Sequence, residues 1–393
     1  MNGDASACKH ASKNSPVNRA RFFPLCQRKR RELTLQSELG EIKLTADYGQ
    51  DPLSGQWVCA LQRHWGLSPH QKITPGFADK LCFRATATGS YEEAAQVAAH
   101  WTQTAVSRST VHKLVQRLGA RAEQQTQERL AQGPREARAQ RQASELAVLM
   151  VDGWMVRQRG PGWGRPQTQQ NRVAWHELKT GVFYLQEQSA QTAGGRGLLA
   201  DKVIVSWQGQ AGELERRLNG EALRGGLGRA KNVLFLGDGA PWIWNLQQDR
   251  WAGAVGLLDF YHASQHCWNV WRAVRGEKDP QLPQWMDRRL HWLRHGQERR
   301  VGREIAHLKP PPGEAGPMLQ REQAYFASQA QRMNYQAIAQ RGWPIGSGAV
   351  ESACRQKQCR FKRPGQFGTQ PGLRHLLALD EARRNHHWDQ LWN

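Results

Sequence analysis

The sequence predicts an α/β protein in which a mixed sheet is covered by helices and follows a helical N-terminal region. Three observations support this prediction. Continuously apolar runs begin at Leu146 and recur beyond it, as in strands buried on both faces. Several strands come first, and strands then alternate with helices. The preceding stretch, about 70–142, shows helical periodicity instead. The length of 393 residues is enough for two or three domains.

The first expected elements are a tail and a hairpin. Residues 1–30 are polar and basic, so we expect them to form a disordered tail. In the next segment, 31–70, LTLQSELGEIKLTADYG alternates apolar and polar residues on either side of a Gly-containing turn. This alternation predicts a β-hairpin that starts at Leu33.

The region 71–145 is expected to hold a helix-turn-helix and a linker. Ser90 and Glu93 form an S-x-x-E capping box at the start of the first helix. In the second helix, apolar residues recur at helical spacing up to Gly119, which is expected to close the helix. The polar stretch 121–145 then predicts a solvated helical linker.

The second helix of this pair exposes residues that suit contacts to phosphates and base edges. They are Arg108, Ser109, His112, Lys113, Gln116 and Arg117. We therefore predict that this helix reads DNA. The alternative is an ordinary pair of amphipathic helices.

From Leu146 the sequence predicts the sheet and its helices, which form the domain 146–393. The predicted strands are ELAVLMVDGW, a strand pair RVAWHELKTG and GVFYLQ that turns at Thr180-Gly181, KVIVSWQ, NVLFLGDG and AVGLLDFYH. The predicted helices are AGELERRLNGEALRGG, PWIWNLQQD, one near Ala349–Phe361 and a last one to about Asn385. Residues 262–340 are expected to be mostly helical and are basic.

The charge of the chain is its strongest compositional feature. Lys and Arg number 55 against 34 Asp and Glu, which gives a net charge of +21. Such an excess favours a polyanionic partner, above all nucleic acid; a basic protein with a solvated surface is the alternative. The first residues contain no apolar stretch of signal-peptide length, and no apolar run in the sequence is long enough to predict a membrane span. Seven scattered cysteines without a CxxC pair fit reduced thiols. We therefore expect a cytoplasmic protein.

Two predicted strands end in the same way, AVLMVDG at Asp152 and VLFLGDG at Asp238. Either Asp-Gly alone is typical of a turn. However, both preceding runs are continuously apolar and a helix follows Asp238, which favours buried strand ends over hairpin corners. Because ligands bind beyond the carboxyl ends of such strands, we expect both acids at one cleft. Trp242 and Trp244 are expected to pack against the sheet, with a stacking surface for an unpaired base as the alternative.

A third acid, Glu351, opens the helix that follows Gly346-Ser347-Gly348. The helix dipole alone favours a carboxylate in the first turn. Here the acid also continues into a basic and amide-bearing face with Arg355, Gln358 and Lys362, which suits phosphates. Three carboxylates in a basic protein have a chemical use, because Mg²⁺ prefers oxygen ligands. Two such ions about 4 Å apart can catalyse phosphodiester chemistry.

A further motif, D-x-x-H, consists of Asp259 and His262 at the end of the last predicted strand, with His266 one helical turn on. A zinc site is one interpretation, because H-x-x-x-H on a helix can chelate. However, the motif lacks the glutamate that follows the first histidine in zinc hydrolases. We expect Asp259 and His262 to belong to the catalytic group by hydrogen bonding near the acids.

These motifs resemble those of bacterial insertion-sequence transposases with a DDE triad, of the Kra type, which are related to Mutator-like and 256-type elements. The matching pieces are VDGW, WHELKTGVFY, FLGDGAPWIW, LLDFYHASQH and GSGAVESACRQKQCRFKR, in this order, and less distinctively SYEEAA and STV in the helix-turn-helix region. The resemblance implies a ribonuclease-H-like fold with a helical insertion, about 263–345, and a metal-binding triad of Asp152, Asp238 and Glu351. Relatives often carry paired cysteines near the N-terminal hairpin. This chain has only Cys59 there, so we infer no zinc site.

The resemblance also implies a function. Such a transposase binds the terminal inverted repeats of its element, cuts DNA by Mg²⁺- or Mn²⁺-dependent hydrolysis with two ions, and joins the freed 3′-hydroxyls to target DNA. Basic residues near the third acid are then expected to contact phosphates. They are Arg355, Arg360, Lys362 and Arg363. We expect a homodimer or larger assembly, in a nucleoid-associated bacterial protein. The alternatives are a metal-dependent nuclease without strand transfer and an inactive DNA-binding repressor.

Overall fold

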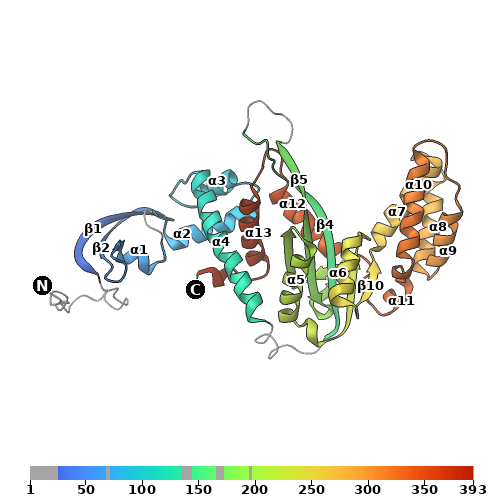
Figure 1. The fold of residues 1–393 in the computed structure, drawn as a ribbon, viewed down its shortest axis with the longest axis horizontal. Helices are drawn as coiled ribbons and strands as arrows, with labels where there is room; N and C mark the ends of the chain where they lie inside the picture. The colour runs from blue at the N-terminus through green and yellow to red at the C-terminus, as the bar shows by residue number, and fades with distance from the viewer. Residues whose placement is uncertain (1–24, 68–70, 134–143, 165–171, 194–196, 393) are drawn as a thin grey trace. The chain divides into compact units, whose positions relative to one another are not determined.

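The structure is a computed structural model that describes residues 25–67, 71–133, 144–164, 172–193 and 197–392 (Figure 1). Contacts within the chain divide it into two compact units, Met1–Val115 and Gln116–Asn393. None of the described helices is long and apolar enough to cross a membrane.

The first unit begins with a small antiparallel sheet in the order β1-β2-β3. Its strands are β1 (Cys26–Ser37), β2 (Gly40–Gln50) and β3 (Trp57–Cys59). The turn lies between Ser37 and Gly40, so the predicted hairpin is confirmed. The tail expected over 1–30 is wrong at its end, because residues 26–30 pair with β2 in the hairpin ladder. Residues 1–24 lie outside the described residues.

Helices follow this sheet. They are α1 (Ala60–His64), α2 (Pro75–Ala87), α3 (Tyr91–Trp101) and α4 (Arg108–Gln132). The predicted cap of α3 is confirmed, since the Ser90 hydroxyl accepts a hydrogen bond from the Glu93 amide at 2.9 Å. The predicted apolar stripe of α4 is buried; its members are Val111, Leu114, Val115 and Leu118.

Two expectations about α4 are wrong. Gly119 does not close the helix, which continues to Gln132. A Cβ at Gly119 would clash with the carbonyl oxygen of His375, so this glycine permits close packing instead. The stretch after it is also no simple solvated linker, because Glu123 pairs with the buried Arg217. Residues 134–143, the rest of the expected linker, lie outside the described residues.

Within the described residues, the second unit contains a five-stranded mixed sheet in the order β10-β9-β4-β5-β8. The strands are β4 (Ser144–Arg159), β5 (Val173–Leu185), β8 (Val203–Gln208), β9 (Ala230–Gly237) and β10 (Val255–Leu258). Strands β10, β9 and β4 run parallel, whereas β5 is antiparallel to β4 and β8. The predicted mixed sheet is therefore confirmed. A small ladder joins β6 (Ser189–Gln191) to β7 (Gly197–Leu199).

The predicted turn at Thr180-Gly181 is wrong, because β5 runs straight through both residues. Gly181 lies in mid-strand, and a Cβ there would be 2.5 Å from Leu218 of α5 (Ala211–Gly225). The glycine thus serves helix-on-sheet packing, a use of glycine in strands that the sequence does not distinguish from a turn.

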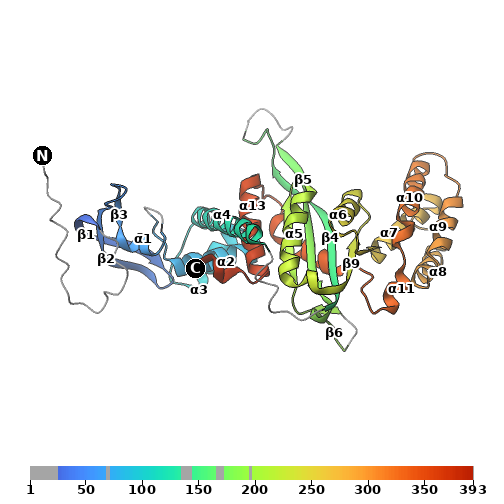
Figure 2. The same cartoon turned by 60° about the horizontal axis from the view of Figure 1, so that its bottom comes forward.

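Helices cover both faces of this sheet. Thr180 contacts α12 (Gly348–Phe361) through the Cys354 thiol, whereas its neighbour Gly181 faces α5. Because consecutive strand residues point to opposite faces, α5 and α12 lie on opposite sides of the sheet, as Figure 2 shows. The remaining helices near the sheet are α6 (Pro241–Trp251) and α13 (Gln370–Arg384).

A helical insertion separates β10 from α12. It consists of α7 (Phe260–Arg275), α8 (Leu282–Arg294), α9 (Glu298–His307), α10 (Ala315–Gln329) and α11 (Tyr335–Gln340), drawn in yellow to orange in Figure 1. The helical character expected for 262–340 is confirmed. Short 3₁₀ turns complete the described elements: Gln186–Gln188, Leu227–Arg229, Ala330–Arg332 and Trp388–Trp392.

Candidate active site

Asp152 and Asp238 lie at the same edge of the sheet. The parallel pairing of β4 with β9 ends at Val151 and Gly237, and the two aspartates are the residues that follow. The predicted strand end at Asp152 is nevertheless wrong, because β4 continues to Arg159 in its ladder with β5. Asp152 thus marks the point where its neighbour β9 stops, and the sequence of β4 alone does not carry that signal.

The two carboxylates interact electrostatically. Burial, and next the negative charge of Asp238, raise the pKa of Asp152 to about 6. Opposing contacts come from the Gly153 amide at 2.7 Å, the Cys354 thiol and the charge of His262. A carboxyl group whose ionisation is disfavoured by burial and by a second acid is typical of a site that binds a cation or handles protons.

Asp238 occupies a tight junction between β9 and α6. Its Oδ1 accepts a hydrogen bond from the Ala240 amide at 2.9 Å, and Gly239 has a φ of +99°. Since α6 starts at Pro241, the Asp-Gly is a strand-to-helix junction, as predicted, and no hairpin corner. Trp244 is buried against Phe235, which confirms the predicted packing for this residue. Trp242 is only half-buried.

A second group of acids lies where the insertion leaves and rejoins the sheet. Asp259 caps α7 by accepting a hydrogen bond from the Tyr261 amide at 2.9 Å. The Ser347 hydroxyl lies between two carboxylates, 2.7 Å from Oδ2 of Asp259 and 3.0 Å from Oε1 of Glu351. The third predicted acid is therefore held next to the D-x-x-H aspartate.

Helix α12 brings these two groups of acids together. Glu351 is in its first turn, and Cys354, one turn later, donates a hydrogen bond from its thiol to Asp152. The Asp259 amide in turn donates to the Gly237 carbonyl, next to Asp238, at 2.9 Å. The described contacts thus gather Asp152, Asp238, Asp259 and Glu351 at one edge of the sheet.

The histidines behave differently from each other. His262 is close enough to Asp152 for its charge to act on that carboxyl group, as expected of a residue beside the acids. His266 instead bonds through Nδ1 to Glu322 of α10 and stacks on Tyr325 with ring centroids 3.5 Å apart. His266 therefore contacts the insertion through these two residues of α10.

Tyr325 links this insertion to the aspartate junction. Its hydroxyl donates to the carbonyl oxygen of Asp238 at 2.8 Å, and the Gln329 amide donates to Gly239 at 3.3 Å. Burial, followed by the charge of Asp238, raises the pKa of Tyr325 well above its usual range, so this hydroxyl stays a donor. The insertion therefore supports the backbone that carries Asp238.

Four residues of this site escaped sequence reasoning. Ser347 enters the sequence analysis only as part of the Gly346-Ser347-Gly348 segment before α12, and Cys354 stands at an apolar position of that helix. Tyr325 and Glu322 stand in a helical stretch whose pattern gives no sign of a contact with the sheet. Polar residues inside apolar patterns, such as Cys354, are the one signal that could have pointed to the site.

The predicted DNA-contacting residues are mostly exposed. In α4 the exposed ones are Arg108, Ser109, His112, Lys113 and Arg117. Near the third acid, Arg355 and Arg363 are exposed and Lys362 is half-buried. Arg360 is buried and donates to Gln366 at 3.2 Å, so it packs the end of α12 and is the weakest of the predicted phosphate contacts.

Tyr325→Phe is expected to lower the stability of the Asp238 junction by about 1 kcal/mol, because one hydrogen bond to a backbone carbonyl is lost. Hydrogen exchange of the 238–240 amides measures this change. Tyr48→Phe is the control, since its ring stays stacked on Trp57 in the first unit. Equal protection of these amides in Tyr325→Phe and the parent protein would contradict the supporting role.

The fold and the site define a mixed α/β protein with carboxylates gathered at the edge of its central sheet. The chain belongs to the Uncharacterised protein family (UPF0236), whose model matches residues 18–301. The match includes Asp152, Asp238 and Asp259, while Glu351 lies beyond it. No curated protein matches the chain. Among solved structures, it is similar to a chain of the Drosophila P element transposase strand transfer complex, with 10% identity and a TM-score of 0.38, over 79% of this chain and 92% of that one.

Proposed function

We propose that the chain is a DNA transposase of an insertion sequence, with Asp152, Asp238 and Glu351 as its catalytic acids. One observation carries the proposal. Asp152 and Asp238 directly follow the last residues of the parallel pairing between β4 and β9, and they interact electrostatically. A third acid, Glu351, reaches the same edge on α12, whose Cys354 thiol bonds to Asp152. The resemblance of the motifs to DDE transposases of the Kra type supports the same assignment of the three acids.

The residues of the site fit a divalent cation such as Mg²⁺ or Mn²⁺. Their donor atoms are carboxylate oxygens, and a cation next to Asp152 and Asp238 would relieve the repulsion that raises the pKa of Asp152. Within the described residues, no three acidic, histidine or cysteine side chains form a group that could hold a metal ion by themselves. The aspartate pair would therefore hold the ion together with waters and substrate phosphates, as is usual for Mg²⁺. Bound there, the cation supplies charge stabilisation at the phosphate.

The chain's own residues have separate tasks in this proposal. Asp152 and Asp238 would hold the cation next to the reacting phosphate, and Glu351 reaches the same edge of the sheet from the first turn of α12. Ser347 and Asp259 orient Glu351 through the hydroxyl that lies between the two carboxylates. Tyr325 positions Asp238 by its backbone. The charge of His262 works to lower the pKa of Asp152 and so favours its ionised form.

DNA binding in this proposal uses two sets of basic residues. The exposed residues at the start of α4 read the element ends, and Arg355, Lys362 and Arg363 bind phosphates near the acids. Because phosphate contacts release counterions, affinity should fall steeply with salt. Two element ends must be brought together for transposition, so we propose a homodimer or larger assembly on DNA.

A strand-transfer assay tests this function. The purified full chain is incubated with Mg²⁺, a target plasmid and labelled, pre-cleaved duplexes from the ends of the element that encodes it. We expect covalent joining of the labelled 3′ ends to the target. Hydrolysis of uncleaved ends without any joined product would instead favour a metal-dependent nuclease. Specific binding of the ends without hydrolysis or joining would indicate a DNA-binding repressor.

A further inference from the structure

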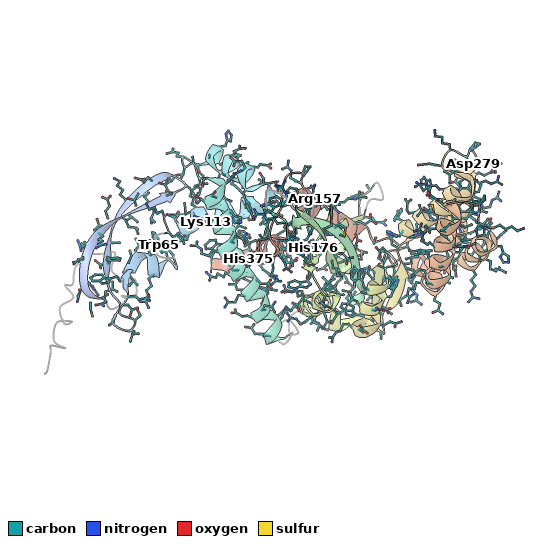
Figure 3. The ribbon with its side chains drawn as sticks, turned by 45° about the horizontal axis from the view of Figure 1, so that its top comes forward. Trp65, Lys113, Arg157, His176, Asp279 and His375 are labelled. Carbon is teal, nitrogen blue, oxygen red and sulfur yellow. The ribbon has the colours of Figure 1, made fainter. Side chains whose placement is uncertain are left out.

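Beyond the carboxylates, β4 and β5 continue as a two-stranded arm. β9 leaves β4 at Val151 and β8 leaves β5 at Leu178, so beyond these points β4 and β5 form a ladder with each other, and Gln158 of β4 adds an isolated bridge to Gly368. Figure 1 shows this green ribbon extending past the other strands, and Figure 3 labels Arg157 and His176 on it. The segment 362–368 lies along the arm, because the Arg159 amide donates to the Gly368 carbonyl at 3.0 Å.

The two faces of the arm differ sharply. One face is buried and carries Trp154, Val156 and Gln158. On the other face, Arg157 stands directly opposite Trp175, a residue that is 52% exposed. Met155 on the same face is 42% exposed, and Trp163 beyond the end of β4 is 40% exposed. Large apolar side chains rarely stay exposed in such a group unless something binds them.

Cations alternate with these exposed rings. The Arg157 guanidinium lies 5.6 Å from the ring of Trp175 and 5.5 Å from that of Phe367. The Arg159 guanidinium lies 5.3 Å from the Trp163 ring, and the Lys362 ammonium lies 5.8 Å from that of Trp175. We call this set the arm surface; its members are Met155, Arg157, Arg159, Trp163, Trp175, Lys362 and Phe367.

The charge of the arm surface suits a polyanion. Arg172 and Arg363 add two more exposed cations beside it. The acid on this face, Glu177, is paired with Lys179. The Lys179 ammonium also lies over the ring of Trp242 at 5.1 Å, and a Cβ on Gly153 would be 3.4 Å from that ring. Trp242 stands in the first turn of α6, the helix that follows Asp238, so rings and cations continue from the arm surface to the start of this helix.

We propose that the arm surface binds an unpaired DNA strand, with bases stacked on Trp163 and Trp175 and phosphates on Arg157, Arg159 and Lys362. Stacking on aromatic rings requires base faces, which a duplex conceals and a single strand presents. The cations follow the backbone in the same way that grooves for single strands do. That the strand then enters a reaction at Asp152 rests on the proposed function, whereas its binding does not.

The test measures binding without chemistry. The full chain is titrated in EDTA with a single-stranded oligonucleotide that carries 2-aminopurine, and with a duplex of the same length. Stacking on a ring quenches 2-aminopurine, which a phosphate contact alone does not do. We expect Trp163→Ala and Trp175→Ala each to weaken single-strand binding about 5-fold or more and to reduce the quenching. Duplex affinity should be unchanged.

Two further variants sharpen the result. Trp57→Ala is the matched control, since Trp57 in the first unit is 41% exposed and has the Lys29 ammonium 5.9 Å from its ring. It should leave the quenching unchanged. Lys362→Gln should weaken single strand and duplex together and flatten the salt dependence, because it removes a phosphate contact.

Three outcomes would overturn the proposal. They are unchanged single-strand binding in both Trp163→Ala and Trp175→Ala, an equal loss for single strand and duplex in these two variants, and an equal loss of quenching in Trp57→Ala. Because no metal is present, these results are independent of strand transfer. Loss of quenching in the arm variants of a chain that shows no strand transfer would keep the arm surface and reject only the proposed function.

Discussion

Asp238→Asn is expected to lower strand cleavage and joining at least about 10³-fold while leaving DNA affinity in EDTA unchanged. A cation held by anionic carboxylates stabilises the charge of the phosphate in the transition state by several kcal/mol. Each 1.4 kcal/mol of this stabilisation corresponds to about tenfold in rate. The variant is otherwise conservative, because an asparagine oxygen can still accept the hydrogen bond from the Ala240 amide. Single-turnover rates with saturating protein measure the effect.

For the same variant, Asp238→Asn, we expect activity to fall but stability to stay the same or rise. Burial and the charge of Asp238 raise the pKa of Asp152, so the folded state bears a repulsion between two carboxylates. Neutralising Asp238 removes this repulsion, and the variant should be at least as stable as the parent protein in the absence of metal. A thermal denaturation series in EDTA checks this. Loss of activity together with unfolding would contradict the assignment.

Asp249→Asn is the matched control for this experiment. Asp249 is an exposed acid near the end of α6, the helix that follows Asp238, so the two variants remove the same charge before and within one helix. Activity should persist in Asp249→Asn. Glu351→Gln should resemble Asp238→Asn in activity. If Glu351→Gln cleaves and joins DNA at the parental rate, Glu351 is a partner of Ser347 and no catalytic acid.

The elements around these acids could be predicted because their signals are local. The apolar run before Asp238 and the proline that begins α6 identify a strand followed by a helix without any tertiary information. The same holds for the cap at Ser90 and for the hairpin of β1 and β2. In each case the residues that determine the structure are within one turn or one strand of it.

The errors arose where a distant residue decides the local structure. Gly181 resembles a turn, but Leu218 of α5 needs the space that a side chain would fill. Asp152 resembles a strand end, but only β9 stops there, and β5 continues beside β4. Tyr325 contacts Asp238 although the two residues are 87 positions apart in the sequence. Such contacts depend on the packed fold, so no local sequence pattern predicts them.

One contact of this kind fixes the helix that carries Glu351. Lys357, three residues after Cys354 on α12, is fully buried, and its ammonium lies 2.9 Å from Oδ2 of Asp380 on α13. Burial works to raise the pKa of Asp380, but the charges of Lys357 and Arg384 outweigh it and hold this pKa below its usual range. A charge buried this deeply is costly to leave without its partner.

Lys357→Met is therefore expected to destabilise the packing of α12 on α13 by about 3 kcal/mol, because it leaves the buried carboxylate of Asp380 with only Arg383 and Arg384. Hydrogen exchange of the α12 amides measures the free energy of local opening directly. Lys231→Met is the control, since the Lys231–Glu145 pair is exposed on both sides and such pairs contribute about 0–1 kcal/mol.

The position of Lys357 also connects this stability to the site. A helix that opens more easily holds Cys354 and Glu351 less firmly against Asp152, so Lys357→Met should slow strand joining in proportion to the loss of α12 protection. Lys231→Met should change neither quantity. If α12 protection falls while joining is unaffected, Glu351 does not need α12 to be fixed against β4, and the three-acid site would have to be reduced to the aspartate pair.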